Sequence, residues 1–280
     1  MTFPDSTPRL LVVTPTLGET PLIEQTVRGV AALRLPLLHV LAAPASRIGE
    51  LKSRFPGTLV VADAGRAGGV YGAINAGLAA VPSGWDWFTY INDDDLLLPG
   101  FETLYARHML LPGRPAVGYG DVALMREDGS VLSRITTERT PSWIPALLQQ
   151  GISPLMQQGT IFRRDVVERL GAFDLRYRLC ADLDFWLRAL TSGFGFRHHA
   201  VTVAGFRLRS GQLSSDTRLT EREQEAIVAS LLPARVAPVV RILAKCRYRL
   251  LNLPRYVERA RMGGLRTSYA LLASGAVPTK

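Results

Sequence analysis

Three consecutive carboxylates, Asp93, Asp94 and Asp95, directly follow the apolar run 87–91 and Asn92. The run has the length and composition of a buried strand, so these polar residues are expected at its carboxyl end. Adjacent carboxylates repel one another, and a fold that holds them together usually supplies a cation. Hard oxygen ligands suit Mg²⁺ or Mn²⁺. The alternative is a solvated acidic turn that caps the next helix.

The acidic cluster lies within a longer alternation of strand and helix patterns. Strands are predicted at residues 10–14, 37–41, 59–61 and 87–91, and helices at 23–31 and 71–80. This alternation predicts an α/β fold with a mostly parallel sheet, right-handed crossovers and helices on both faces. Ligands of such sheets bind at the carboxyl ends of strands, where Pro15, Thr16 and the acidic cluster fall.

A hairpin pattern follows this first part of the chain. The segments 122–125 and 130–135 flank Asp128 and Gly129, which are typical residues of a tight turn between antiparallel strands. The sequence therefore predicts an antiparallel insertion after the parallel part of the sheet.

Two further segments have the chemistry of a binding site. The glycine-rich stretch 68–77 enters a predicted helix, where free backbone N–H groups can receive a diphosphate. A tight turn before a packing helix explains the same glycines. Asp182 begins another predicted helix, where a carboxylate can act as a general base toward a hydroxyl or can cap the helix.

The formal net charge of +9 belongs to the C-terminal part of the chain. Residues 231–280 hold ten Lys or Arg against the single acid Glu258, so the first 230 residues carry no net charge. Arguments from positive charge therefore concern this basic tail alone.

The tail contains an amphipathic pattern at 239–250. The residues of its apolar face are Val239, Leu243, Cys246 and Leu250, and those of its basic face are Arg241, Lys245 and Arg249. Residues 235–266 are expected either to contact an anionic membrane surface or to pack on the main domain with a solvated basic face. Pro254 and Gly263-Gly264 break the tail into at least two helices. Binding to nucleic acid is not expected, because no reader motif or set of stacking aromatics accompanies the charge.

Compartment signals are few. Cys180 and Cys246 lack the spacing of a metal or redox motif, which fits a reducing environment. No leader pattern and no apolar run of about 20 residues is found. A cytoplasmic location is expected, with a peripheral position at the inner face of the plasma membrane if the tail binds lipid.

Taken together, these segments resemble the inverting, non-processive family 2 glycosyltransferases of the GT-A fold, a Rossmann-like α/β architecture. The four matching segments are Pro15-Thr16, 69–77, Asn92 to Asp95 with Pro99-Gly100, and 158–188. The resemblance implies a GT-A domain at 1–215, with a nucleotide-sugar half at about 9–120 and an acceptor half at about 121–215. Residues 216–280 would form a C-terminal basic helical extension.

The family resemblance implies transfer of one sugar from a nucleotide diphosphate sugar to an acceptor hydroxyl, in polysaccharide, lipopolysaccharide or other cell-envelope glycan assembly. Asp182 would be the catalytic base, and Asp94 would bind Mn²⁺ or Mg²⁺. The residues implied at the nucleotide sugar are Pro15, Thr16, Asp63, Tyr71, Asn75, Asn92 and Asp93. Three more residues are implied either to contact the acceptor or to support the residues that contact ligand: Gln158, Asp184 and Arg209. The acceptor would be a glycan or a lipid-linked glycan.

The chain departs from the family pattern in two places. Ala42-Ala43-Pro44-Ala45 replaces an acidic, glycine-rich turn, and Arg209 stands where a metal-binding histidine often occurs. An arginine cannot ligate a cation but can bind a diphosphate. The pair His198-His199 is expected to be structural or exposed. Two alternatives stay open: a non-catalytic nucleotide-sugar-binding or membrane-associated protein of this fold, and a metal-dependent nucleotidyltransferase.

Overall fold

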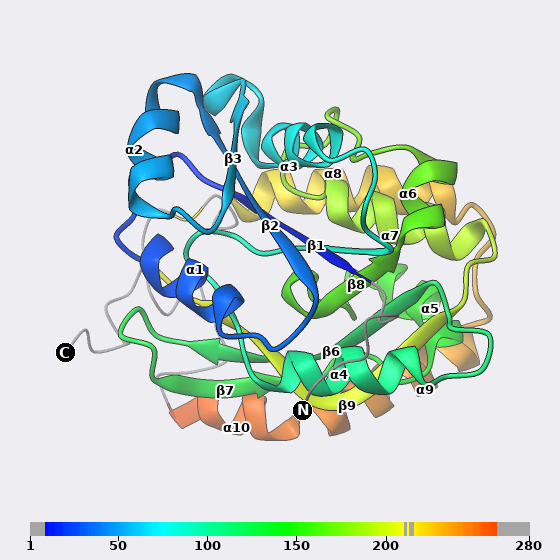
Figure 1. Cartoon of the computed structure of the whole chain (residues 1–280). Helices are drawn as coiled ribbons and strands as arrows, with labels where there is room; N and C mark the ends of the chain where they lie inside the picture. The colour runs from blue at the N-terminus through cyan, green and yellow to red at the C-terminus, as the bar shows by residue number, and fades with distance from the viewer. Residues whose placement is uncertain (1–8, 210–211, 213–215, 262–280) are drawn as a thin grey trace.

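The computed structural model describes residues 9–209, 212 and 216–261 (Figure 1). Within these residues one sheet has the strand order β3-β2-β1-β4-β8-β6-β9-β5, and β7 pairs with β6. The strands are β1 Leu10–Pro15, β2 Leu37–Pro44, β3 Leu59–Asp63, β4 Trp87–Tyr90, β5 Leu96–Leu97, β6 Val117–Met125, β7 Val131–Ile135, β8 Thr160–Arg163 and β9 Phe196–Arg207.

Helices cover both faces of the sheet, as predicted. The α-helices are α1 Ile23–Ala31, α2 Ile48–Arg54, α3 Gly69–Ala80, α4 Gly100–Met109, α5 Ile144–Leu148, α6 Arg164–Leu170, α7 Ala181–Thr191, α8 Thr217–Leu231, α9 Pro238–Leu251 and α10 Leu253–Arg261. Short 3₁₀ turns are η1 Ala45–Arg47, η2 Gly65–Ala67, η3 Pro141–Trp143 and η4 Gln157–Gly159.

The central strand β1 is apolar throughout because both of its faces are buried. Leu11 and Val13 pack into one core with α3 and α7, whereas Leu10 and Val12 pack into a second core with α4. Alternate residues of a strand point to opposite faces, so a strand between two helical layers needs apolar side chains at every position. This explains the continuous apolar run in the sequence.

The parallel part of the sheet is confirmed for β3-β2-β1-β4. The predicted hairpin is also confirmed: β6 and β7 pair antiparallel, and Gly129 takes φ +88° in the turn. Beyond β4 the sheet is mixed rather than mostly parallel, because β8 enters antiparallel between β4 and β6, while β9 runs parallel to β6. The strand β8 follows two glutamines and is too short to give a periodic signal.

Residues 216–261 pack closely on the sheet domain. Helix α8 lies against α7, α9 against α5, and α10 against β7. None of the helices in the described part of the chain is long and apolar enough to cross a membrane. The division of the chain at 215/216 stays a prediction.

Candidate functional site

A cavity of about 1030 Å³ opens at the carboxyl ends of β1 and β4. Its walls come from the β1 and β4 turns, the start of α3, the start of α7 and the end of β9. The residues predicted from sequence that line it are Pro15, Thr16, Asp63, Tyr71, Asn92, Asp93, Asp94, Gln158, Asp182 and Arg209. The fold therefore brings residues from both halves of the chain to one place.

Asp93 ties the β4 turn to the β1 turn. Its Oδ2 accepts a 2.6 Å hydrogen bond from the Thr16 hydroxyl, whose oxygen accepts from the N–H of Gly18 at 2.9 Å. Burial raises the pKa of Asp93 to about 6. The negative charge of Asp94 also raises this pKa, whereas the hydrogen bond from Thr16 lowers it. This carboxylate is therefore fixed in position and titrates near neutrality.

Asp94 is buried and forms an ion pair with Arg209. The Arg209 Nε lies 2.6 Å from the Asp94 Oδ2, and the Gln212 amide lies 3.4 Å from the same oxygen. Because the pair joins the β4 turn to the segment after β9, it closes one side of the cavity.

Asp95, the third acid, is a structural residue. Its side chain is fully buried, and it accepts hydrogen bonds from the Gln158 Nε2 at 2.7 Å and from the Arg207 N–H at 2.9 Å. Burial and the neighbouring Asp94 raise its pKa well above the ordinary range. Arg207, which sequence reasoning missed, is also fully buried and donates to the Asp94 carbonyl at 2.8 Å and to the Gln25 side chain.

Asp182 lies at the start of α7 and faces the cavity. Its Oδ1 accepts from the Leu183 N–H at 2.8 Å and lies 3.0 Å from the Tyr71 hydroxyl, which can donate to it. Burial raises the pKa of Asp182 to about 6, although both hydrogen bonds favour the ionised form. The N-cap residue of α7 is Cys180, so Asp182 does not occupy the capping position.

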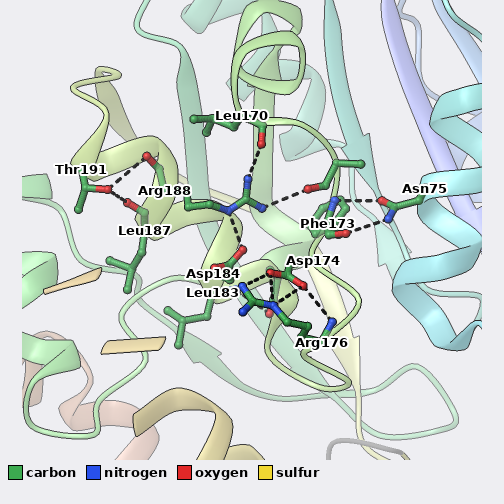
Figure 2. A network of polar contacts seen from close by, with 12 residues as sticks. Asn75, Leu170, Phe173, Asp174, Arg176, Leu183, Asp184, Leu187, Arg188 and Thr191 are labelled. Atoms are coloured by element: carbon green, nitrogen blue, oxygen red, sulfur yellow. Dashed lines mark hydrogen bonds and ion pairs between the residues drawn. The ribbon is translucent and has the colours of Figure 1, made fainter. Parts of the chain in front are cut away.

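Two predicted site residues lie outside the cavity lining, and Figure 2 shows what they do instead. Asn75 makes a pair of hydrogen bonds with the backbone of Phe173, at 2.9 and 3.0 Å. Both its amide donor and its carbonyl acceptor are used, so its expected place in the nucleotide pocket is not observed.

Asp184 points to Arg188, one turn further along α7, at 2.7 Å. Arg188 in turn donates to the carbonyls of Leu170 at 2.7 Å and Ala172 at 3.1 Å. Asp184 therefore orients an arginine that holds the loop before α7, and Asp184 itself does not line the cavity.

Two buried acceptor atoms in the cavity lining lack a hydrogen-bond partner among the described residues. They are the Asn92 Oδ1 and the Gln158 Oε1. Buried polar atoms are nearly always paired in folded proteins. Asn92 and Gln158 line the cavity, so a ligand with hydroxyl or amide donors is a candidate partner for these two acceptors.

The glycine-rich segment forms the second wall of the cavity. Gly69, the first residue of α3, has φ +65°, a conformation that favours glycine, and lines the cavity with Val70. Asp63 lies across from it at the end of β3, where its carboxylate accepts from the Gly65 N–H at 2.6 Å and burial raises its pKa. The free N–H groups of the first turn of α3 suit an anion.

The donor set fits a divalent ion that arrives with a nucleotide. Among the described residues, no group of three or more His, Cys, Asp or Glu side chains could hold a metal by itself. Mg²⁺ is commonly held by one or two carboxylates together with water and substrate phosphates. Asp94 and Asp93 can supply those carboxylates once Arg209 has moved from Asp94.

The histidine pair lies at the opposite end of β9 from Arg207. His198 pairs with Asp121 at 3.0 Å, and His199 pairs with His108 at 2.9 Å. Burial lowers the pKa of both His108 and His199 to about 4, so these two rings are neutral. The pair is structural, as expected from the sequence.

Comparison with solved structures identifies the fold as GT-A. The chain is similar to the mannosyltransferase PcManGT from Pyrobaculum calidifontis, solved with GDP-Man and Mn²⁺, with TM-score 0.58 and 18% identity over 99% of this chain and 81% of that one. It is similar to S. aureus TarS 1-349 in complex with UDP-GlcNAc, with TM-score 0.61 and 14% identity over 96% and 82%.

A third similar structure is glucosyl-3-phosphoglycerate synthase from Mycobacterium tuberculosis with Mn²⁺, UDP and glucosyl-3-phosphoglycerate. It has TM-score 0.53 and 16% identity over 82% of each chain. No family model matches the sequence, and no curated protein matches it either. The chain therefore has the GT-A fold, although its sequence differs greatly from the sequences of these structural neighbours.

Proposed function

We propose that this protein is an inverting glycosyltransferase of family 2 type, which moves one sugar from a nucleotide diphosphate sugar to an acceptor hydroxyl. The observation that carries the proposal is the meeting of Asp182 with Asp93 and Asp94 in one cavity. A carboxylate with a pKa near 6 and a separate acidic cluster are the two parts that base-assisted transfer from a phosphate leaving group needs.

In this proposal Asp182 accepts the proton of the acceptor hydroxyl as the oxygen attacks the anomeric carbon. The nucleoside diphosphate leaves from the opposite face, so a single displacement inverts the configuration. Tyr71 holds the ionised carboxylate in place through its hydroxyl. Asn92, Gln158 and Asp93 contact hydroxyls of the ribose or the sugar, which would pair the two unsatisfied acceptors.

The diphosphate would lie between the first turn of α3 and Arg209, which lines the same cavity. Asp94 would hold Mn²⁺ or Mg²⁺, and such an ion neutralises charge on a diphosphate leaving group. The three structural neighbours named above bind GDP-Man, UDP-GlcNAc or UDP, and two of them hold Mn²⁺. These ligands support a nucleotide sugar as the donor.

We further propose that the acceptor is a glycan or a lipid-linked glycan of the cell envelope, used at the inner face of the plasma membrane. The cavity that contains Asp182 also has apolar lining residues, among them Leu124, Ile135, Leu155 and Leu208. Such a lining suits a lipid chain next to the reacting hydroxyl.

The first experiment is a thermal-shift screen of nucleotides and nucleotide sugars with and without Mn²⁺ or Mg²⁺, because a ligand that binds only the folded state raises the melting temperature. A metal-dependent shift that is lost in Asp94→Ala would support the donor site. The identified donor is then used to compare the wild type with Asp182→Asn. Donor binding should survive in this variant while sugar transfer disappears.

Two other results would overturn the proposal. Retained activity in Asp182→Asn, with nucleotide transfer instead of sugar transfer, would indicate a nucleotidyltransferase. Donor binding without transfer to any acceptor fraction, in the wild type, would indicate a non-catalytic nucleotide-sugar-binding protein.

A further inference from the structure

Helix α9 packs on the sheet domain through one of its faces. Ala244 and Tyr248 are buried in a small core with Ala146 and Leu147 of α5. Gln150, which follows α5, donates to the Arg241 carbonyl at 2.9 Å. The rotation of α9 about its own axis is therefore fixed by apolar packing.

Polar contacts at the same face reinforce this orientation. Asn252, between the two helices, is 1% exposed and exchanges two 2.9 Å hydrogen bonds with the backbone of Thr136. Arg247 pairs with the buried Glu138, and its guanidinium lies 4.9 Å from the ring centre of Trp143. With these anchors on one side, the opposite side of α9 faces outward.

The outward side is apolar, which differs from the expectation of a solvated basic face. The exposed fractions run from 43% to 70% along a stripe made of Val239, Ile242, Leu243, Leu250, Leu253 and Val257. Within α9, spacings of three, four and seven residues place the first four on one helical face. Within α10, a spacing of four residues does the same for Leu253 and Val257. The helix is therefore packed on the domain, but it presents its apolar face to the outside rather than a solvated basic face. Residues 262–266 of the predicted basic segment lie outside the described residues.

Basic side chains border this stripe. Arg249 is exposed, and Lys245 is half-buried on the same flank. Arg235 is exposed just before α9, and Arg261 is 73% exposed at the end of α10. A contiguous exposed apolar surface with a basic border is unusual on a monomer in water, and it is typical of helices that lie in a membrane interface.

We propose that this stripe inserts into the surface of an anionic lipid bilayer, with the bordering Lys and Arg side chains on the lipid phosphates. The basic border favours an anionic lipid surface over a second copy of the chain as the partner. Two stripes packed face to face would also bring their positively charged borders together, and these borders would repel each other. Insertion removes the apolar side chains from water, and the anionic headgroups attract the border.

Docking through this face would also orient the cavity. Arg255 of α10 lines the same cavity as Asp182, and its Nε is buried without a partner among the described residues. This second step rests on the proposed function: an acceptor anchored in the bilayer would reach Asp182 past Arg255, which suits a phosphate-linked lipid.

The experiment is flotation of the full-length protein with vesicles of phosphatidylcholine alone and of phosphatidylcholine with about 30% phosphatidylglycerol. The wild type should float with the anionic vesicles. The double variant Leu243→Ser/Leu250→Ser should bind them at least about tenfold more weakly, because two inserted side chains are lost. The matched control is Leu110→Ser, which removes an 83% exposed leucine elsewhere and should bind like the wild type.

Three results would overturn docking. The wild type could fail to float with the anionic vesicles. The double variant could float as well as the wild type. Sedimentation velocity could show a wild-type dimer that the double variant loses, which would make a second copy the occupant. The thermal shift with nucleotides should be the same in all variants, so failure of docking is distinguishable from failure of the donor site.

Discussion

At the scale of single residues, the ion pair between Arg209 and Asp94 bears on the metal site of the proposed function. The guanidinium already neutralises the Asp94 carboxylate, so under that proposal a divalent ion at Asp94 competes with Arg209.

In Arg209→Met the apparent affinity of the protein for Mn²⁺ alone should rise by about tenfold, the equivalent of about 1.4 kcal/mol, because the competing cation is gone. Titration calorimetry in the absence of nucleotide measures this affinity directly. Arg66→Met is the matched control, since it removes an arginine of the cavity lining that pairs with the exposed Glu19 at 2.6 Å. Unchanged or weaker Mn²⁺ binding in Arg209→Met would contradict a role for Asp94 as a metal ligand.

Under the proposed function, the pH dependence of transfer is expected to follow the ionisation of Asp182. A base works only when ionised, and burial raises the pKa of this carboxyl to about 6, so kcat/KM should fall below that pH by about tenfold per unit. In Tyr71→Phe the ionised form loses a hydrogen bond, so the midpoint should move to higher pH.

The measurement is kcat/KM from about pH 5 to about pH 9 for each variant. Because the pKa of Asp93 is also raised to about 6, Thr16→Val serves as the control: it removes the bond to Asp93 and should leave the midpoint in place. A midpoint that moves in Thr16→Val and not in Tyr71→Phe would assign the titration to Asp93.

At the scale of secondary-structure elements, helix α8 holds the start of α7. The Glu223 carboxylate, buried under α8, accepts from the backbone N–H groups of Arg178, Leu179 and Cys180 at 2.7, 2.8 and 2.9 Å. These residues lead directly to Asp182. The helix after the sheet domain is thus part of what positions the candidate base.

Glu223→Gln should lower the free energy of unfolding by about 1 to 3 kcal/mol. Both carboxylate oxygens of Glu223 accept hydrogen bonds, whereas Gln has one acceptor oxygen and an NH₂ group that would face a backbone N–H. It should also lower kcat more than it changes donor affinity, since the donor side of the cavity does not contact Glu223. Chemical denaturation and steady-state kinetics measure the two effects. Glu225→Gln, an exposed change on the same helix, is the control. Equal losses in both variants would contradict the role.

The elements differ in how far the sequence predicts them. Strands β1 to β4 and the β6-β7 hairpin follow from apolar runs and from Asp128-Gly129, which are local signals. The roles of Arg207 and Glu223 depend on partners far away in the chain, and no local pattern marks them. The contact between Asn75 and the backbone of Phe173 has no local signal for the same reason, because it forms only once the chain has folded.

At the scale of the whole molecule, one sheet contains both β4, which leads into the acidic cluster, and β8, against which the Asp182 helix α7 packs. Strand β8 joins β4 of the parallel part to β6 of the mixed part. The predicted nucleotide-sugar and acceptor halves therefore share a hydrogen-bonded sheet and a common core, which the sequence pattern alone left as two consecutive halves.

Because of this shared sheet, thermal unfolding should be a single transition, with calorimetric and van't Hoff enthalpies that agree. A bound nucleotide should shift the whole transition upward. Differential scanning calorimetry with and without nucleotide tests both statements. Two separate transitions, of which only one responds to nucleotide, would contradict the view of the halves as one cooperative unit.

The hairpin β6-β7 and helix α10 have a consequence for how such a molecule can diversify. They supply Leu124, Ile135 and Arg255 to the cavity, whereas the acidic cluster and the α3 entry come from other elements. Under the proposed function, substitutions on the hairpin and α10 would exchange one acceptor for another without disturbing the donor chemistry. Acceptor choice and donor choice are then inherited on separate stretches of the gene, and a lineage can change the first while selection preserves the second.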